Sequence, residues 1–539
     1  MQSRMTPAAV LSGGLMLGAL AFGAAVLPVA TAAAAAAAET TLTYSWPRNG
    51  GALNPHLYSP NEMTAQSLVY EPLLKYRADG TLEPWLATAW EVSPDGRVYT
   101  FTLREGVTFS DGVPFDAAAV KANFDAVLAN LERHRWLELA AQIERTEVID
   151  PRTFRLTLKG AYYPTLYDLA LVRPFRFLSP AAIPAGGSTA EGIVAPIGTG
   201  PWRLVEARLG EFDLYARNDR YWGEAPAFDR LLVKVIPDTN ARAVAFETGG
   251  IDLIYGGDSQ ISANTFARLQ ARGDLWTGIS APQATRALAI NSGRAPTDDL
   301  AVRQAISHAV DKRAIVASVL HDLEPVAETL FAPNVPYADI GLPPHAFDPA
   351  RAAALLEAAG WIAPKPGAIR EKNGLPLRLE LCFVGNEPQE KAIAEIIQAQ
   401  LRVVGIDAAL VGEEKSAFQA RQKDGSFGMI FNATWGAPYE PHSFVASMRM
   451  PSHADYQAQS GLPMKADLDA RISAVLVSVD EAERQALYTD ILTTLHQQAV
   501  YLPISYLTSV AVARPTIENV TFGATRNEIP LHTIRPAAR

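Results

Sequence analysis

Residues 377–405 read LRLELCFVGNEPQEKAIAEIIQAQLRVVG. Leu377–Val384 is an apolar run of the length of a buried strand, and Gln389–Val404 repeats apolar residues at helical spacing. Gly405 ends the predicted helix, since glycine tolerates the left-handed backbone that follows many helices. A strand that passes directly into a helix is typical of an α/β fold.

The chain on both sides of this unit continues the alternation. Amphipathic helices are predicted for Ala301–Leu320 and for Pro349–Ala359, which Gly360 closes. Two apolar, strand-like runs, Leu288–Asn291 and Ala499–Leu507, flank the region, and we interpret them as crossings into and out of a second lobe. The predicted domains are an N-terminal lobe (39–282), a C-terminal lobe (283–505) and a return segment (506–539) that completes the first lobe.

The first half of the chain predicts strands around one helix. Residues 97–109 alternate apolar and polar side chains, and Thr153–Leu158 forms a second strand-like run. Between them, Asp116 is a plausible N-cap of a helix with apolar residues at helical spacing as far as Leu131. The cluster of residues 133–135, Arg-His-Arg, then falls where a helix dipole favours cations.

Composition limits the class of protein. The chain has 539 residues, too many for one ordinary domain, and is 48% hydrophobic, so it can bury a large core. Its formal net charge of −10 argues against nucleic acid as a partner. A single cysteine, Cys382, excludes an internal disulfide, and its apolar neighbours predict a core thiol.

The N-terminus predicts export. Arg4 precedes an apolar run and a tract of alanines that ends at residue 38, which is the pattern of a secretory signal peptide. We therefore expect residues 1–38 to be removed and the mature protein to be periplasmic. The alternative is an uncleaved membrane anchor, because about 20 apolar residues can span a bilayer.

Motifs of common enzymes are absent from the sequence. It contains no Walker-type phosphate loop, no Gly-x-Ser-x-Gly elbow and no His-Glu-x-x-His zinc motif. None of the nine histidines forms a His-x-His or His-x-x-x-His pair. A metal site must therefore combine distant residues or use ligands that a cargo supplies, and we expect no enzyme activity.

Several motifs resemble those of a known family. YEPL (70–73), PWLA (84–87), SPDG (93–96) and IGTGPW (197–202) look like the family 5 extracellular solute-binding proteins, the peptide- and nickel-binding components of ABC importers. The resemblance implies a two-lobed α/β periplasmic-binding-protein fold (type II, dipeptide/nickel-binding cluster) with an extra subdomain in the N-terminal lobe. It also implies ABC permease and ATPase subunits as partners.

Further motifs are similar to those of the nickel-binding members: LNPHLY (53–58), RHRWLEL (133–139), RPFRF (173–177), WGAPY (435–439) and PSHAD (451–455). In those members nickel arrives as a complex with a small organic chelator, so Ni(2+) is cargo and no intrinsic cofactor is expected. The resemblance places one direct metal ligand on His453. It places ligand contacts on Tyr58, Ser59, Met63, Arg133, Trp136, Arg173, Gln419, Trp435, Tyr439 and Asn527. Haem binding and a monomeric state follow from the resemblance alone.

Physical chemistry agrees with such a site. One imidazole suits nickel but is a poor cage for a bare ion. Two arginines, Arg133 and Arg173, can hold the carboxylates of a chelator in bidentate hydrogen bonds. The sequence departs from the family at Ser59, Gln419 and Asn527, which leaves the identity of the chelator open.

Two other functions compete with this interpretation. Peptide importers commonly carry an aspartate that pairs with the peptide's amino terminus, but the corresponding residue here is Pro438. An ammonium buried without a counter-charge is costly, which weighs against peptides. An exported hydrolase or metalloenzyme needs a nucleophile–base pair or a metal cage, and the sequence shows neither.

Overall fold

The computed structural model describes residues 39–57, 62–257 and 260–538. The predicted signal peptide and two predicted ligand contacts, Tyr58 and Ser59, lie outside the described residues. The described residues from Thr40 onward form one compact unit. No helix in the described ranges is long and apolar enough to cross a membrane.

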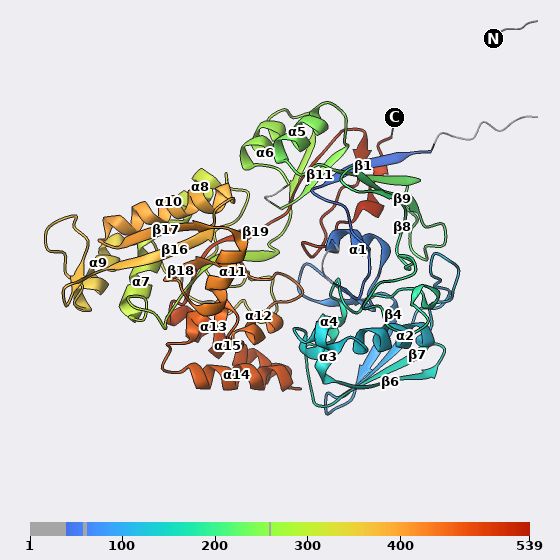
Figure 1. The fold of residues 1–539 in the computed structure, drawn as a ribbon, viewed down its shortest axis with the longest axis horizontal. Helices are drawn as coiled ribbons and strands as arrows, with labels where there is room; N and C mark the ends of the chain where they lie inside the picture. Colours follow the sequence, from blue (N-terminus) through green and yellow to red (C-terminus); the bar gives the residue numbers. More distant parts are fainter. Residues whose placement is uncertain (1–38, 58–61, 258–259, 539) are drawn as a thin grey trace, which may run out of the picture. The chain divides into compact units, whose positions relative to one another are not determined.

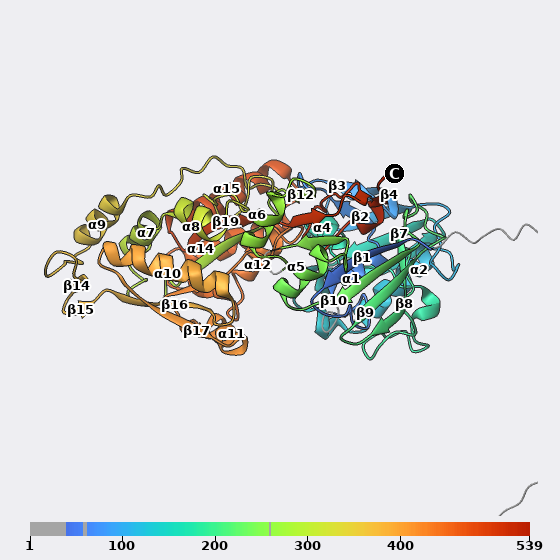
Figure 2. The same ribbon diagram turned by 90° about the horizontal axis from the view of Figure 1, so that it is seen from above.

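A mixed five-stranded sheet contains the strand predicted at Leu377–Val384. Its order is β17 (Asp407–Glu413), β16 (Arg378–Val384), β18 (Met429–Phe431), β13 (Ala284–Ile290) and β19 (Tyr501–Leu507). All seven residues of β13 and of β19 are buried, which explains their continuous apolar sequences. Helices α8 (Lys312–Val319) and α10 (Pro388–Val403) pack on this sheet (Figures 1 and 2).

A three-stranded antiparallel sheet contains the strands that precede β13 and follow β19 in the sequence. Its order is β11 (Leu253–Gly256), β20 (Val510–Ala513) and β12 (Trp276–Ile279). The chain therefore passes between the two sheets twice, at residues 280–283 and 508–509. The two passages bond to each other, because the amide of Ser280 donates to the carbonyl of Ser509 (2.8 Å) and the Ser509 hydroxyl donates to Gln283 Oε1 (2.8 Å).

Two four-stranded sheets complete the larger β-structure. One has the order β1 (Thr41–Trp46), β10 (Arg230–Val235), β9 (Phe212–Arg217) and β8 (Trp202–Arg208). The other is antiparallel, with the order β4 (Ala87–Val92), β5 (Val98–Leu103), β7 (Thr153–Leu158) and β6 (Ile143–Asp150). Its buried face packs on helix α2 (Ala117–Leu128), as the pattern of residues 97–158 predicts.

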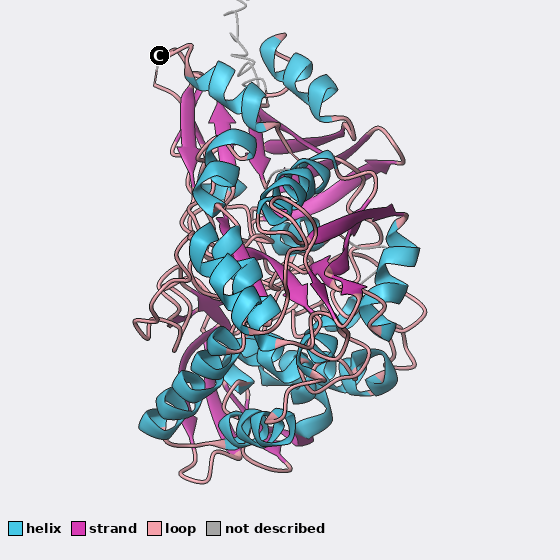
Figure 3. Ribbon diagram, turned by 90° about the vertical axis from the view of Figure 1, so that its left-hand side faces the viewer, coloured by secondary structure: helices cyan, strands magenta, loops and turns pink. Residues whose placement is uncertain are grey.

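The remaining elements are short strand pairs and helices. Figure 3 shows helices and strands interspersed in the described chain. The strand pairs are β2 (Leu74–Tyr76) with β3 (Leu82–Pro84), β14 (Glu371–Lys372) with β15 (Leu375–Pro376), and β21 (Ile517–Glu518) with β22 (Arg535–Pro536). The other helices are α1 (Met63–Val69), α3 (Glu138–Gln142), α4 (Thr165–Leu169), α5 (Thr239–Glu247), α6 (Ala263–Gln270), α7 (Leu300–Ala309), α9 (Pro349–Ala358), α11 (Lys415–Asp424), α12 (His442–Ser447), α13 (Ala454–Gln459), α14 (Lys465–Val477) and α15 (Glu481–Gln497). Three 3₁₀ turns are η1 (Leu131–His134), η2 (Pro180–Ala182) and η3 (Leu531–Thr533).

Two predicted helices differ from the observed ones. Residues 301–320 form two helices instead of one, because the side chain of Asp311 accepts from the amide of Ala314 and starts α8 as a new N-cap. Helix α2 begins after its predicted cap, Asp116, but ends at Leu128, so Arg133 lies in η1 and not in the last turn of α2.

Candidate functional site

A cavity of about 590 Å³ brings together residues from distant parts of the chain. We call it the first cavity. Its lining includes residues of α1, of the segment that follows β11, of the turn after β18 and of the C-terminal segment. The lining residues are Trp46, Glu62, Met63, Thr64, Trp136, Arg173, Gly256, Gly257, Gln260, Trp435, Ala437, Tyr439, Ser509, Arg526 and Asn527.

Six of the residues predicted to contact a ligand line the first cavity. They are Met63, Trp136, Arg173, Trp435, Tyr439 and Asn527. Arg133 and Gln419 are exposed and do not line it. His453 is not in the lining either, but its ring lies next to a ring that is. The ligand-binding roles of all these residues stay predictions.

Aromatic rings form a continuous row along one wall. The ring centroids of Trp136 and Tyr439 are 6.2 Å apart, and those of Tyr439 and Trp435 are 6.4 Å apart in an edge-to-face arrangement. The Trp435 ring in turn lies 5.8 Å from the imidazole of His453. The row therefore leads from the cavity wall to the one side chain that the sequence proposes as a metal ligand.

The His453 imidazole is held at the start of a short helix. His453 is the N-cap of α13, and its amide donates to the carbonyl of Met450 (3.0 Å). The side-chain amide of Gln457 donates to the carbonyls of Pro451 (2.9 Å) and Lys423 (3.0 Å), which ties the loop before His453 to the end of α11. Burial lowers the pKa of His453, so the ring is neutral at pH 7 and keeps a lone pair for a metal ion.

Arg173 brings a positive charge to the same wall. Its guanidinium is hydrogen-bonded to the Tyr439 hydroxyl; burial raises the pKa of that hydroxyl, and Arg173 offsets part of the rise. Arg526 adds a second cation to the lining. The acidic lining residue among those described is Glu62, which is paired with Arg48 (3.0 Å) and accepts from the Trp46 indole (3.2 Å). The electrostatics of the first cavity therefore favour an anionic ligand.

A buried carboxyl stabilises the turn that carries Trp435 and Tyr439. Glu440 is 1% exposed, and its Oε1 accepts from the amide of Gly436 (2.6 Å). Burial raises its pKa to about 7, and this hydrogen bond lowers the pKa only in part. Gly436 has φ +83°, and a Cβ there would lie 2.7 Å from the carbonyl oxygen of Gln283, so this turn requires glycine.

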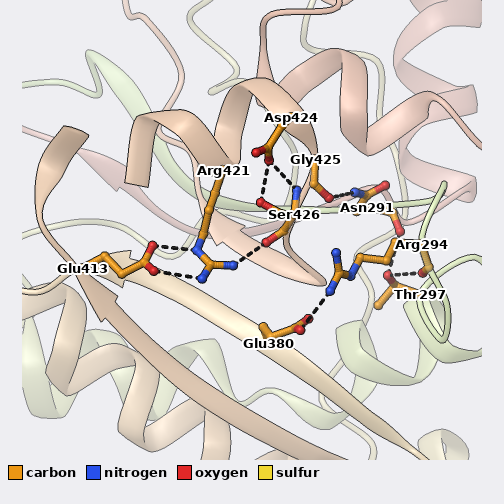
Figure 4. A network of polar contacts seen from close by, with 9 residues as sticks. All are labelled: Asn291, Arg294, Thr297, Glu380, Glu413, Arg421, Asp424, Gly425 and Ser426. Carbon is orange, nitrogen blue, oxygen red and sulfur yellow. Dashed lines mark hydrogen bonds and ion pairs between the residues drawn. The ribbon is translucent and has the colours of Figure 1, made fainter. Parts of the chain in front are cut away.

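The contacts of α11, some of which Figure 4 shows, explain why Gln419 does not line the first cavity. Arg421 in α11 donates to both oxygens of Glu413 (2.6 and 2.8 Å) and to the carbonyl of Ser426 (2.7 Å). These bonds fix α11 on the sheet with Phe418 as its buried residue. The next residue in a helix points about 100° away, so Gln419 faces solvent.

Sequence reasoning missed several lining residues. Trp46, Glu62, Gln260 and Arg526 belong to no motif with an obvious chemistry. Arg526 could have been predicted as a lining residue from its position, because it directly precedes Asn527, for which the resemblance implies a ligand contact. No group of three or more His, Cys, Asp or Glu residues in the described ranges is arranged to hold a metal ion.

Comparison with known proteins identifies the family. The model described as bacterial extracellular solute-binding proteins, family 5 Middle, matches residues 81–456. The chain belongs to this family. As a family 5 member it is a solute-binding protein with a mixed α/β fold and not an enzyme, and the resemblance inferred from its motifs is confirmed.

Three relatives show where the chain stands within family 5. It is 52% identical to the nickel-binding periplasmic protein of Escherichia coli (strain K12) over 512 residues, 95% of this chain and 98% of the relative. It is 60% identical to NikA from Brucella suis, solved in complex with Fe(III)-EDTA, with a TM-score of 0.90 over 92% of this chain and 100% of that one. Identity to the dipeptide-binding protein of Escherichia coli (strain K12) is 26% over 531 residues, 93% of this chain and 95% of the relative.

Proposed function

We propose that this chain is the periplasmic substrate-binding component of an ABC-type nickel importer. It captures nickel as a complex with a small carboxylate chelator, for example histidine, and delivers it to the membrane permease. The observation that carries the proposal is the first cavity, whose aromatic row ends at the neutral imidazole of His453 and whose lining holds Arg173 and Arg526.

Each part of the proposed ligand has a matching group in this arrangement. A chelated nickel ion has most of its positions filled, so one protein imidazole completes its coordination. The chelator's carboxylates meet the guanidinium groups, which suit planar anions. The rings of Trp136, Trp435 and Tyr439 exclude water around the complex.

The relatives support the same ligand class. The sequence identity of this chain to the nickel-binding periplasmic protein of Escherichia coli, 52%, is twice its identity to the dipeptide-binding protein, 26%. NikA from Brucella suis was solved with a metal ion inside a polycarboxylate chelator. A peptide ligand instead needs an acid for its ammonium group, and the acidic lining residue, Glu62, is already paired with Arg48.

Delivery requires two lobes that close on the ligand. We propose lobes of residues 39–282 with 506–539, and of residues 283–505, joined by the passages at 280–283 and 508–509. Trp136 and Arg173 then belong to one lobe, and Trp435, Tyr439 and His453 to the other. Hinge closure of this kind is common in periplasmic binding proteins.

An uptake assay tests the proposed function. Spheroplasts with a compatible nickel permease and ATPase but no binding protein should accumulate radioactive nickel when the mature protein and histidine are added together. Omitting histidine, or replacing wild type with His453→Ala, should reduce accumulation strongly. Uptake that is equally fast without the protein would contradict the proposal.

A further inference from the structure

A second cavity of about 380 Å³ lies between the end of α1, strand β2 and the C-terminal segment. No residue lines both cavities. The charged and polar side chains in its lining include Glu71, Lys75, Arg176, Tyr221, Glu528 and His532.

Most charges in this second cavity already have partners. Arg176, 2% exposed, pairs with Glu528 (2.7 Å) and donates to the backbone carbonyls of Leu171 and Tyr70. Arg77 pairs with Glu83 at the rim (3.4 Å). These pairs are locally neutral and hold the walls together.

The carboxylate of Glu71 also has hydrogen-bond partners, since it accepts from four uncharged donors. Its Oε1 accepts from the Trp85 indole (2.7 Å) and the Tyr221 hydroxyl (3.2 Å). Its Oε2 accepts from the Thr199 hydroxyl (2.7 Å) and the Trp222 indole (3.0 Å). With both oxygens occupied, this carboxyl has little capacity left to bind a cationic ligand.

Lys75 and His532 differ from these groups. The Lys75 ammonium lies 3.4 Å from the centroid of the Trp85 ring, and no described residue accepts a hydrogen bond from it. Burial lowers its pKa, an effect that the carboxylates of Glu528 and Glu71 counter in part. His532 likewise has no hydrogen bond to a described residue; burial lowers its pKa to about 4, and the Lys75 charge adds to the effect.

We propose that the second cavity binds a small oxyanion, whose oxygen atoms accept hydrogen bonds from the Lys75 ammonium and the His532 imidazole. The Lys75 ammonium has no hydrogen-bond acceptor among the described residues, and an oxyanion supplies one in a charge-assisted hydrogen bond. The ligand chemistry is that of a carboxylate or of an inorganic oxyanion such as phosphate. The site does not depend on nickel.

The second cavity shares a chain segment with the first. Residues 522–524 and 528–530 line the second cavity, whereas Arg526 and Asn527 line the first. An oxyanion hydrogen-bonded to His532 would therefore restrict the segment that presents Arg526 and Asn527. Its occupancy is expected to change the affinity of the first cavity for its own ligand.

Calorimetric titration of the metal-free mature protein tests the site. Acetate and phosphate are titrated separately, so that the two arms distinguish a carboxylate from an inorganic oxyanion. We expect saturable binding at one site per chain for at least one anion. Lys75→Met should weaken it by about tenfold to a hundredfold, since a hydrogen bond to a charged group contributes roughly 1.5–3 kcal/mol, while Lys75→Arg should retain it.

Matched controls separate this site from other effects. Lys372 also lies near an indole, 5.5 Å from the Trp361 ring, so Lys372→Met should bind like wild type. Arg173→Ala tests whether the anion binds in the first cavity instead: loss of binding in this variant, with wild-type affinity in Lys75→Met, would overturn the proposal. His532→Phe, which keeps a ring beside Tyr221, should weaken binding whether or not Lys75→Met folds. Absence of saturable binding, or equal affinity in wild type, Lys75→Met and His532→Phe, would overturn the proposal.

Discussion

His453 closes a row of rings that begins at Trp136 in the first cavity. Its sequence context, a Pro-Ser-His-Ala-Asp loop, predicts a metal ligand only through the family resemblance, since a lone histidine in a loop is usually a surface residue. The structure adds the reason for its placement. Gln457 and the N-cap geometry of α13 hold the loop so that the imidazole lies beside Trp435.

His453→Ala should weaken binding of nickel–histidine by about tenfold or more, which corresponds to at least 1.4 kcal/mol. The variant removes the one nitrogen donor that the protein is proposed to give the metal. Tryptophan fluorescence can follow the titration, because Trp136 and Trp435 line the cavity. His321→Asn, a change at an exposed histidine, is the matched control, and an unchanged affinity in His453→Ala would exclude this residue as a ligand.

Arg173→Ala should affect anionic chelates most. Loss of a charged hydrogen-bond donor costs roughly 1.5–3 kcal/mol, or about tenfold to a hundredfold in affinity. A nickel–tricarboxylate complex should therefore lose more affinity than nickel–histidine in parallel titrations. Arg135→Ala, at an exposed residue paired with Glu132, serves as the control. Equal losses for both complexes would argue against a role in binding carboxylates.

At the scale of elements, the sequence predicted the helix ends that depend on contacts between neighbouring residues. Asp116 and Gly405 mark helix ends because capping depends on neighbouring residues alone. The break at Asp311 inside residues 301–320 was missed because the apolar pattern continues through it. The family resemblance predicts a ligand contact for Gln419, which is exposed on α11. Arg421 of the same helix is held by Glu413 and Ser426 (Figure 4).

The turn between β18 and α12 should be sensitive to pH through Glu440. The folded protein holds this carboxyl with a pKa of about 7, above its ordinary value of 4.5, so the folded state binds the proton more tightly than the unfolded state. The free energy of unfolding therefore falls as pH rises from 5 to 8, by up to about 3 kcal/mol. Glu440→Gln has no carboxyl that titrates at this position. The free energy of unfolding of this variant, relative to that of wild type, should therefore increase with pH.

Urea unfolding at pH 5 and pH 8 measures this difference. The exposed change Glu414→Gln provides a control for the general effect of removing one carboxylate. If Glu440→Gln and wild type differ by the same free energy at both pH values, Glu440 does not titrate in this range in the folded protein.

At the scale of the whole molecule, the family resemblance predicted the class of fold and six of the fifteen residues that line the first cavity. The pairing of β13 with β19 and the passages at 280–283 and 508–509 could not be derived locally, because these contacts join residues more than 200 positions apart. Arg526 and Glu62 were missed for the same reason. Only the folded chain brings them to the wall that Arg173 and Trp435 share.

The proposed hinge predicts a change of dimensions on loading. Closure of the two lobes brings Arg173 and Trp136 nearer to His453 and excludes water from the chelate, so the bound state should be more compact. Small-angle X-ray scattering of the mature protein should show a smaller radius of gyration with saturating nickel–histidine. Unchanged dimensions at saturation would count against closure of the lobes.

Calorimetric titration of the mature protein with four titrants tests the central claim most directly. The titrants are free nickel, nickel with histidine, nickel with a tricarboxylate, and a set of short peptides without metal. We predict tight binding, with one complex per chain, only for chelated nickel, because the protein offers one imidazole and a cationic, aromatic wall. Tight binding of peptides without metal, or of free nickel as strongly as its chelates, would contradict it.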